Sequence, residues 1–153
     1  MPLANATTQA IALAPSAART STFTSDTITN VCSSDILVYL RVSAGPGSLT
    51  GVDTLQLDLQ GYDPASGIWH TVNMAGGTGP VLIDCATTPL THTQKVWWGR
   101  PTSQSNTGGA TQNFYYTSVQ ALLYPQMRVR VTHGGTAGTG SWTYSIGAIL
   151  SAS

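Results

Sequence analysis

Residues 55–72 read LQLDLQGYDPASGIWHTV, and this stretch decides the fold class. Leu55, Leu57 and Leu59 alternate with polar residues, which is the period-two pattern of a β-strand with one buried face. The turn signal YDPASG follows. Its aspartate accepts backbone hydrogen bonds, its proline presets φ, and Gly67 supplies a left-handed conformation. Because a second strand-like run comes next, the stretch predicts a β-hairpin with a loop of about four or five residues.

The same alternation recurs along the chain. Clear strands are predicted at 36–42, 127–131 and 142–146, and weaker ones at 20–29, 80–85, 93–98 and 113–119. No segment has convincing helical periodicity, and the best helical candidate is the short segment 118–124. Strands at spacings of about ten residues are typical of sandwiches and barrels. We therefore predict an all-β fold, an antiparallel β-sandwich or jelly roll of about eight strands.

The first 18 residues differ from the rest. They are rich in alanine, and their apolar residues Leu3, Ile11 and Leu13 are separated by polar ones. The positive charge and compact apolar run of a signal peptide are lacking. A terminal segment this weakly hydrophobic is expected to be ordered only where a neighbour holds it. We predict an extended N-terminal arm over 1–18 and a single domain over 19–153.

Charge is scarce throughout the chain. Charged residues make up 8% of the 153 residues and the net charge is +0, whereas about 25% is usual. Glutamate is absent and Lys95 is the single lysine. Such a surface favours association, so either other subunits cover much of it or the chain is a Thr/Ser-rich secreted β protein. The neutral charge argues against nucleic-acid binding, and no apolar run is long enough for a membrane helix.

Catalytic patterns are missing, so no enzyme, cofactor or metal is predicted. Asp63 belongs to the turn, and Asp58 is expected to face outward from its strand. The histidines lack metal-ligand spacing, and His133 is expected to hydrogen-bond the glycine-rich turn that follows it. Cys32 and Cys85 can be buried small hydrophobes or a disulfide.

Adjacent pairs of aromatic residues are the feature that suggests a binding surface. Trp97 and Trp98 are adjacent on a predicted strand, so one faces inward and the other outward, and Tyr115 and Tyr116 share this ambiguity. An outward tryptophan can pack within the chain, anchor a subunit interface or stack on a sugar. Trp69 and Trp142 alternate in phase with buried faces and are expected in the core, while the polar stretch 99–112 is a candidate contact loop. The interface candidates are Leu3, Ile11, Leu13, Trp97, Trp98, Arg100, Tyr115 and Tyr116.

Four elements together resemble a group of small bacteriophage virion proteins of the capsid decoration, or cement, type. They are the extended strand 36–42, the G-x-D-P-A-S-G-x-W hairpin within 55–69, R-V-R-V-T-H-G at 128–134, and W-x-Y-S-I-G-A at 142–148. The resemblance covers roughly residues 34–150 and consists of strand and turn patterns. It implies a β-sandwich located on the head surface or, less often, in the tail, and it implies no catalytic residues.

The resemblance sets the functional expectation. A decoration protein on the capsid surface of the virion would bind the major capsid protein and copies of itself, as a homo-oligomer for which a trimer is one geometry. The arm would reach across to a neighbour. The alternative is a tail or fibre component that binds host-surface carbohydrate through Trp97, Trp98 and the 99–112 loop. A secreted carbohydrate-binding module is a third reading.

Overall fold

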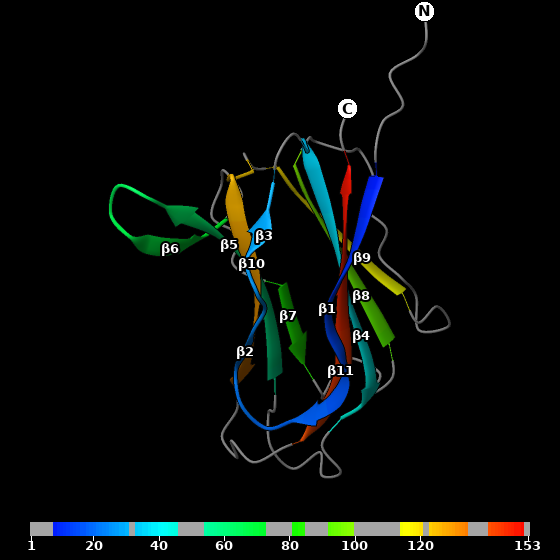
Figure 1. The fold of residues 1–153 in the computed structure, drawn as a ribbon. Coiled ribbons are helices and arrows are strands. Elements are labelled where there is room, and N and C mark those ends of the chain that lie inside the picture. Colours follow the sequence, from blue (N-terminus) through cyan, green and yellow to red (C-terminus); the bar gives the residue numbers. More distant parts are fainter. Residues whose placement is uncertain are drawn as a thin grey trace, which may run out of the picture.

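The computed structural model describes residues 8–30, 33–45, 54–72, 81–84, 92–99, 114–120, 123–134 and 141–151, and these form two facing β-sheets (Figure 1). The expectation of an all-β sandwich is confirmed. The strands are β1 (Thr8–Arg19), β2 (Phe23–Thr24), β3 (Ile28–Thr29), β4 (Asp35–Ala44), β5 (Thr54–Asp63), β6 (Ile68–Thr71), β7 (Val81–Asp84), β8 (His92–Gly99), β9 (Phe114–Gln120), β10 (Gln126–Gly134) and β11 (Trp142–Ser151).

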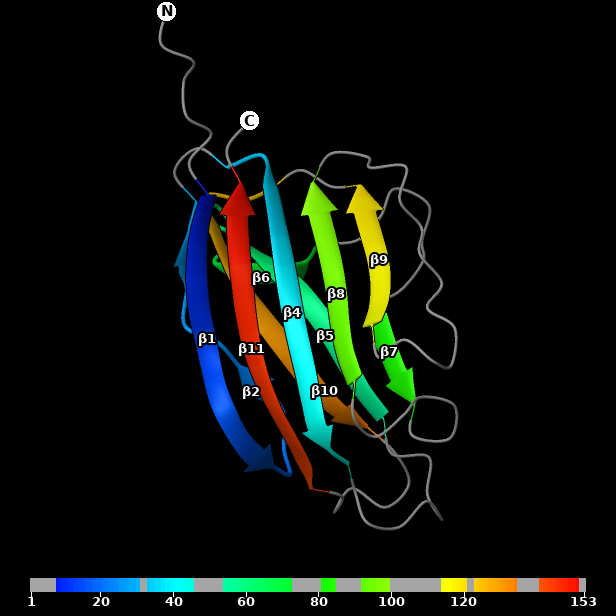
Figure 2. The same cartoon turned by 90° about the vertical axis from the view of Figure 1, so that its right-hand side faces the viewer.

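The strand order is that of a jelly roll. Sheet A has the order β1-β11-β4-β8-β9, and sheet B has the order β2-β10-β5-β6, with β3 also paired to β10 and β7 to β5. The first strand pairs with the last, β2 and β3 pair with β10, β4 pairs with β8, and β5 pairs with β7, all antiparallel. These nested pairs are one long hairpin rolled into two layers (Figure 2). Strand β6 and the parallel edge strand β9 are additions to that scheme.

The core lies between the sheets and is built from alternate residues of the long strands. The predicted phases of β4, β5, β10 and β11 are confirmed, and Trp142 is buried as expected. Each fully buried leucine, isoleucine or valine contributes about 1.5–3 kcal/mol by leaving water, so this cluster supplies the main driving force for folding. Its members include Ile36, Val38, Leu40, Val42, Leu55, Leu57, Leu59, Met127, Val129, Val131, Trp142, Tyr144, Ile146 and Leu150.

The N-terminal region differs from the predicted arm. Residues 8–19 form β1, an edge strand of sheet A that pairs with β11 from Thr8↔Ser151 to Arg19↔Trp142. Ala14 is buried, and Ile11 and Leu13 pack against the core. The predicted boundary between residues 18 and 19 is therefore not seen, because hydrogen bonds to β11 and apolar contacts join 8–18 to the sandwich. Residues 1–7, including Leu3, lie outside the described part.

Two other local expectations are corrected. The segment 114–120, which overlaps the short helical candidate 118–124, is strand β9 and pairs with β8. The weak strand expected over 20–29 is split into β2 and β3, which both pair with β10. Within the described residues, no helix has the length and apolarity that crossing a membrane requires.

Candidate functional site

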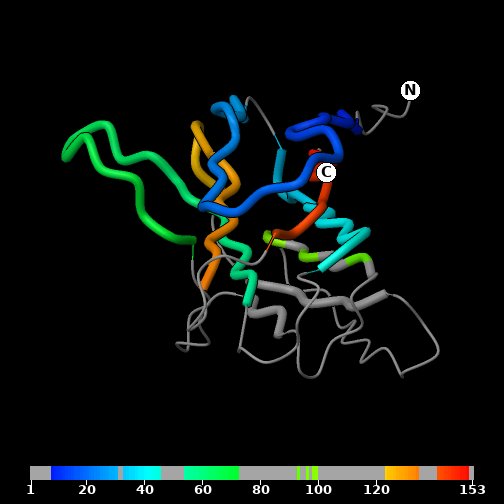
Figure 3. Tube along the Cα trace, turned by 90° about the horizontal axis from the view of Figure 1, so that it is seen from below, coloured from blue at the N-terminus to red at the C-terminus, as the bar shows by residue number. Residues whose placement is uncertain are grey.

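A hairpin projects from the edge of sheet B. Pairing between β5 and β10 ends at Gly61↔Met127, and beyond it Tyr62 and Asp63 pair only with β6. Residues 61–71, called the projecting hairpin, extend well away from both sheets (Figures 1 and 3). A Cβ on Gly61 would lie 2.3 Å from ring atoms of Tyr124, so the absence of a side chain there lets this ring pack against the base of the hairpin.

The tip of the hairpin is held by Asp63, as the sequence predicts. The Ala65 amide donates to Asp63 Oδ1 at 2.9 Å, the Ser66 hydroxyl donates to Oδ2 at 2.7 Å, and the Gly67 amide donates to the Asp63 carbonyl at 2.8 Å. The hydrogen bond from Ser66, followed by that from Ala65, lowers the pKa of Asp63. Gly67 has φ 71°, the left-handed conformation expected of it.

Two aromatic rings and an arginine lie together on this hairpin. Tyr62 and Trp69 are cross-strand partners whose ring centroids are 5.1 Å apart. The guanidinium carbon of Arg128 lies 4.3 Å from the centroid of the Trp69 ring, and Arg128 Nε donates to Gln60 Oε1 at 2.8 Å. The expectation that Trp69 belongs to the core is wrong. This residue lies in the part of the projecting hairpin that extends beyond the sandwich, and its side chain is only half-buried. We call Tyr62, Trp69 and Arg128 the aromatic–arginine cluster.

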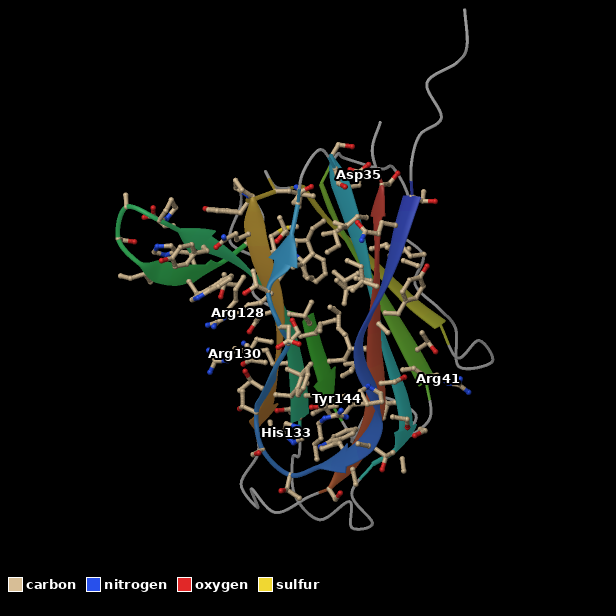
Figure 4. The ribbon with its side chains drawn as sticks, viewed as in Figure 1. Asp35, Arg41, Arg128, Arg130, His133 and Tyr144 are labelled. Carbon is tan, nitrogen blue, oxygen red and sulfur yellow. The ribbon has the colours of Figure 1, made fainter. Side chains whose placement is uncertain are left out.

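The cluster continues along the outer face of sheet B. Arg130 is the cross-strand partner of Asp58, just as Arg128 is the partner of Gln60. Asp58 is on the outward side of its strand, as predicted, yet it is only 5% exposed. Its Oδ2 accepts from Gln56 Nε2 at 3.3 Å, and its Oδ1 has no hydrogen-bond partner among the described residues. Burial raises the pKa of Asp58, against smaller lowering effects from Gln56 and Arg130. Figure 4 shows Arg128 and Arg130 directed away from the sandwich.

The outer face of sheet A is different in character. Between Asp35 and Arg41, the outward residues of β4 are Leu37 and Tyr39, which neighbour Ile149 and Gly147 of β11 across the sheet. Next to β11, β1 presents exposed alanines at positions 10 and 12. Across β1, β11 and β4 the described residues of this stretch carry no charge. This stretch of the outer face is therefore an uncharged surface of small and apolar groups, bordered by Asp35 and Arg41 on β4 and by the register position of Lys95, the cross-strand partner of Tyr39 on β8.

The interface candidates from the sequence are only partly brought together. Trp98 is 3% exposed and its Nε1 donates to the Val72 carbonyl at 3.2 Å, so it is a core residue and not an interface residue. Trp97, Tyr115 and Tyr116 lie on the neighbouring strands β8 and β9, but their side chains are outside the described part, as are Leu3, Arg100, the stretch 100–112 and both cysteines.

Sequence reasoning missed the aromatic–arginine cluster, although a signal was present. Tyr62 and Trp69 flank the predicted turn at positions that a short hairpin places opposite each other, and aromatic cross-strand pairs contact directly. The placement of Trp69 in the core assumes that the strand after the turn stays in the sheet. Only the departure of the hairpin from sheet B reverses that conclusion.

A separate cluster of Arg19, His133 and Tyr144 joins the two sheets near the end of β1. His133 Nε2 and the Tyr144 hydroxyl are 3.2 Å apart, so His133 contacts β11, while the turn at 135–140 that the sequence suggests as its partner lies outside the described residues. The Arg19 guanidinium lies over the rings of Tyr144 and Phe23, and it donates to the carbonyls of Tyr144 at 2.7 Å, Ala17 at 3.0 Å and Pro15 at 2.9 Å. Arg19 thus fastens β1 to β11.

Catalytic geometry does not emerge from these clusters. Within the described residues, no group of three or more histidines, cysteines or acidic residues could hold a metal ion. The aromatic–arginine cluster and the uncharged face of sheet A are suited to binding. Comparison with known proteins finds no matching protein-family model, no similar curated protein and no similar solved structure.

Proposed function

We propose that this protein is a structural component of a bacteriophage virion, specifically a capsid decoration protein that binds the major capsid lattice and copies of itself without catalysing a reaction. The observation that carries the proposal is the uncharged stretch on the outer face of sheet A, across β1, β11 and β4 between Asp35 and Arg41. Half-buried Tyr39, Gly147 and Ile149 in this stretch lose little solvation when another subunit covers them. The jelly roll is a fold used in viral capsids and lectins, which is compatible with this role but does not establish it.

The mechanism proposed for decoration is burial repeated over many copies. Each copy would remove the outer face of sheet A from water across a joint between capsid subunits. Individual contacts can be weak, because attachment at several points raises the effective concentration of each further contact. The predicted reach across to a neighbour is not proposed for residues 8–18, because they pair with β11 in sheet A.

Quantitative mass spectrometry of density-purified virions, with heads and tails separated, tests this proposal first. We expect many copies per head. A low copy number confined to tails would contradict decoration, and absence from the particle would overturn the virion assignment altogether.

A pair of substitutions tests the docking face. Ser145→Arg places a second positive charge beside its cross-strand partner Arg41, next to the uncharged stretch of sheet A, and Ala65→Arg places the same charge on the exposed hairpin tip. In rebinding to particles that lack the protein, we expect Ser145→Arg to weaken binding at least tenfold and Ala65→Arg to bind as wild type. Equal binding by both variants would show that sheet A does not dock.

Host-surface carbohydrate binding, as part of a tail or fibre, is the second candidate, and the projecting hairpin favours it. Half-buried Tyr62 and Trp69 offer aromatic surface away from the body of the protein. The apolar face of a sugar ring can pack against such aromatic rings. Trp69 replaces Trp98 as the expected stacking residue. A glycan array probed with wild type and Trp69→Ala tests it, and a wild type that binds no glycan would rule it out.

A further inference from the structure

We propose that the outer face of sheet B binds a carboxylate-bearing saccharide, with Arg128 receiving the carboxylate. This inference rests on the carbohydrate-binding candidate and adds the chemical class of the sugar. The argument starts from the way in which Arg128 is held.

The guanidinium of Arg128 is fixed on two sides. The guanidinium carbon lies 4.3 Å from the centroid of the Trp69 ring, and Nε donates to Gln60 Oε1 at 2.8 Å, so a ring contact and a hydrogen bond both hold the group. Gln60 is itself 5% exposed, so the anchor does not move freely. Among the described residues, neither Nη1 nor Nη2 of Arg128 has a hydrogen-bond partner. The edge left over is a planar pair of donors.

Such an edge matches a planar oxyanion. Two parallel N–H donors fit the two oxygens of a carboxylate, and the geometry is specific to arginine because lysine is a point charge. Since Trp69 and Gln60 already hold the side chain, binding loses little of the rotamer entropy that an unrestrained arginine would lose. The cluster is thus prepared for an anion before the anion arrives.

A second cation lies beside the first. Arg130 is half-buried on the same face, two residues from Arg128, and forms no salt bridge with a described residue. Its cross-strand partner Asp58 is 5% exposed, so an incoming ligand meets the arginines before that carboxylate. The whole chain has only 6 lysines and arginines, so two on one face give it a distinct positive character.

The surroundings of the arginines favour a sugar over a bare anion. Across the sheet, Thr71 pairs with Gln60 and Thr24 pairs with Arg130, and both threonines are exposed on the same face. Their hydroxyls can donate to and accept from sugar hydroxyls. The half-buried rings of Tyr62 and Trp69 keep surface for the C–H face of a pyranose. The paired donors of Arg128, the threonine hydroxyls and the aromatic rings together suit an acidic saccharide such as a uronate.

Isothermal titration calorimetry with an oligogalacturonate tests the inference on the full chain. The matched probe is the same oligomer with its carboxylates methyl-esterified, which keeps the ring and removes the charge. We expect the acid to bind at least tenfold more tightly than the ester, with binding that weakens as salt rises. A sulfated dextran serves as a second anionic probe, and we expect weaker binding to it than to the acid.

Variants locate the site. Arg128→Gln is expected to remove the preference for the acid, and Arg128→Lys to recover only part of it. Arg41→Gln, which removes the same charge from the exposed face of sheet A, is the control and should bind as wild type (Figure 4). Thermal unfolding of each variant checks that it is folded.

Each contrary outcome has a distinct meaning. Equal affinity for acid and ester, tighter binding of the sulfated probe, or an Arg128→Gln variant that keeps its preference would overturn the inference while leaving carbohydrate binding standing. A wild type that binds none of these probes and no glycan on an array would overturn both.

Discussion

His133 shows how one residue makes the fold sensitive to pH. Burial, reinforced by the positive charge of Arg19, lowers the pKa of His133 below its usual value of 6.5, while burial raises the pKa of Tyr144 to about 12. The neutral ring satisfies its contact with the Tyr144 hydroxyl. A protonated ring would need an acceptor for Nδ1 as well, and that atom is buried with no partner among the described residues. The folded protein therefore resists protonation at this site.

We predict that stability falls as pH drops through 6.5. The unfolded chain takes up a proton at His133 there, whereas the folded chain does not, so the free energy of unfolding decreases toward lower pH. Urea denaturation at pH 7.5 and pH 5.5 measures the loss. His133→Gln should show a smaller difference between the two pH values, and an unchanged difference would assign the effect elsewhere.

The pKa values of Asp58 and Asp63 are shifted in opposite directions. The pKa of Asp58 is raised, so its contribution to the free energy of unfolding is present when it is protonated and is lost as pH rises above 3.8. The pKa of Asp63 is lowered, so its contribution to the free energy of unfolding is present above pH 3.8 and is lost in acid. We predict that Asp58→Asn increases the thermal midpoint at pH 7 and that Asp63→Asn decreases it. Both effects should shrink at pH 3. Differential scanning calorimetry decides, and effects of the same sign would contradict the assignment.

At the scale of elements, the sequence predicts strands well where alternation and turn chemistry agree. Strands β4, β5, β10 and β11 direct every second residue into the core as an apolar side chain, so their patterns are visible without a structure. Strand β1 is not visible because alanine, its commonest residue, has weak strand preference, and because register shifts between Ala12 and Ala17 break its period. Arg19 donates to the carbonyls of Ala17 and Pro15 within that irregular stretch and to that of Tyr144 on β11, and these contacts are not visible in an alternation pattern.

The candidate site was predictable in part. The hairpin and its turn follow from residues 55–72, but the position of Arg128 over Trp69 depends on the register between β5 and β10, which is a tertiary feature. The burial of Trp98 likewise depends on which face of β8 meets sheet B. Adjacent tryptophans must point to opposite sides, but which one is inside is decided by packing.

Deleting residues 1–18 tests the role of β1. Ile11 and Leu13 are each half-buried, together about one fully buried side chain, so we expect a loss of about 1.5–3 kcal/mol in the free energy of unfolding. The uncovered edge of β11 should also promote association. Chemical denaturation measures the first effect and light scattering the second. Deleting residues 1–7 leaves every described strand pairing in place and is the control; equal stability of both truncations would refute this role.

At the scale of the whole molecule, the two sheets present unlike outer faces. Sheet A presents an uncharged stretch bordered by Asp35 and Arg41, while sheet B carries Arg128, Arg130 and the projecting hairpin (Figure 4). A protein docked through sheet A would hold the aromatic–arginine cluster outward. The decoration proposal and the saccharide inference are thus compatible, because they use opposite faces.

The neutral surface has a consequence for behaviour in solution. With a net charge of +0 there is little repulsion between copies, so we predict concentration-dependent association at pH 7 in sedimentation velocity experiments. Ser145→Arg should reduce association if sheet A mediates it, and Ala65→Arg should not. Association unaffected by Ser145→Arg would place the contact on another face.

The pairing of Thr8 with Ser151 makes the chain nearly cyclic. A short linker could join these two residues while new ends are opened at the exposed hairpin tip near Ala65, and every strand pairing described above would be kept. The order in which strands are synthesised would change, but the order in which they lie would not. We therefore expect a circularly permuted chain with ends at the hairpin tip to form the same two sheets.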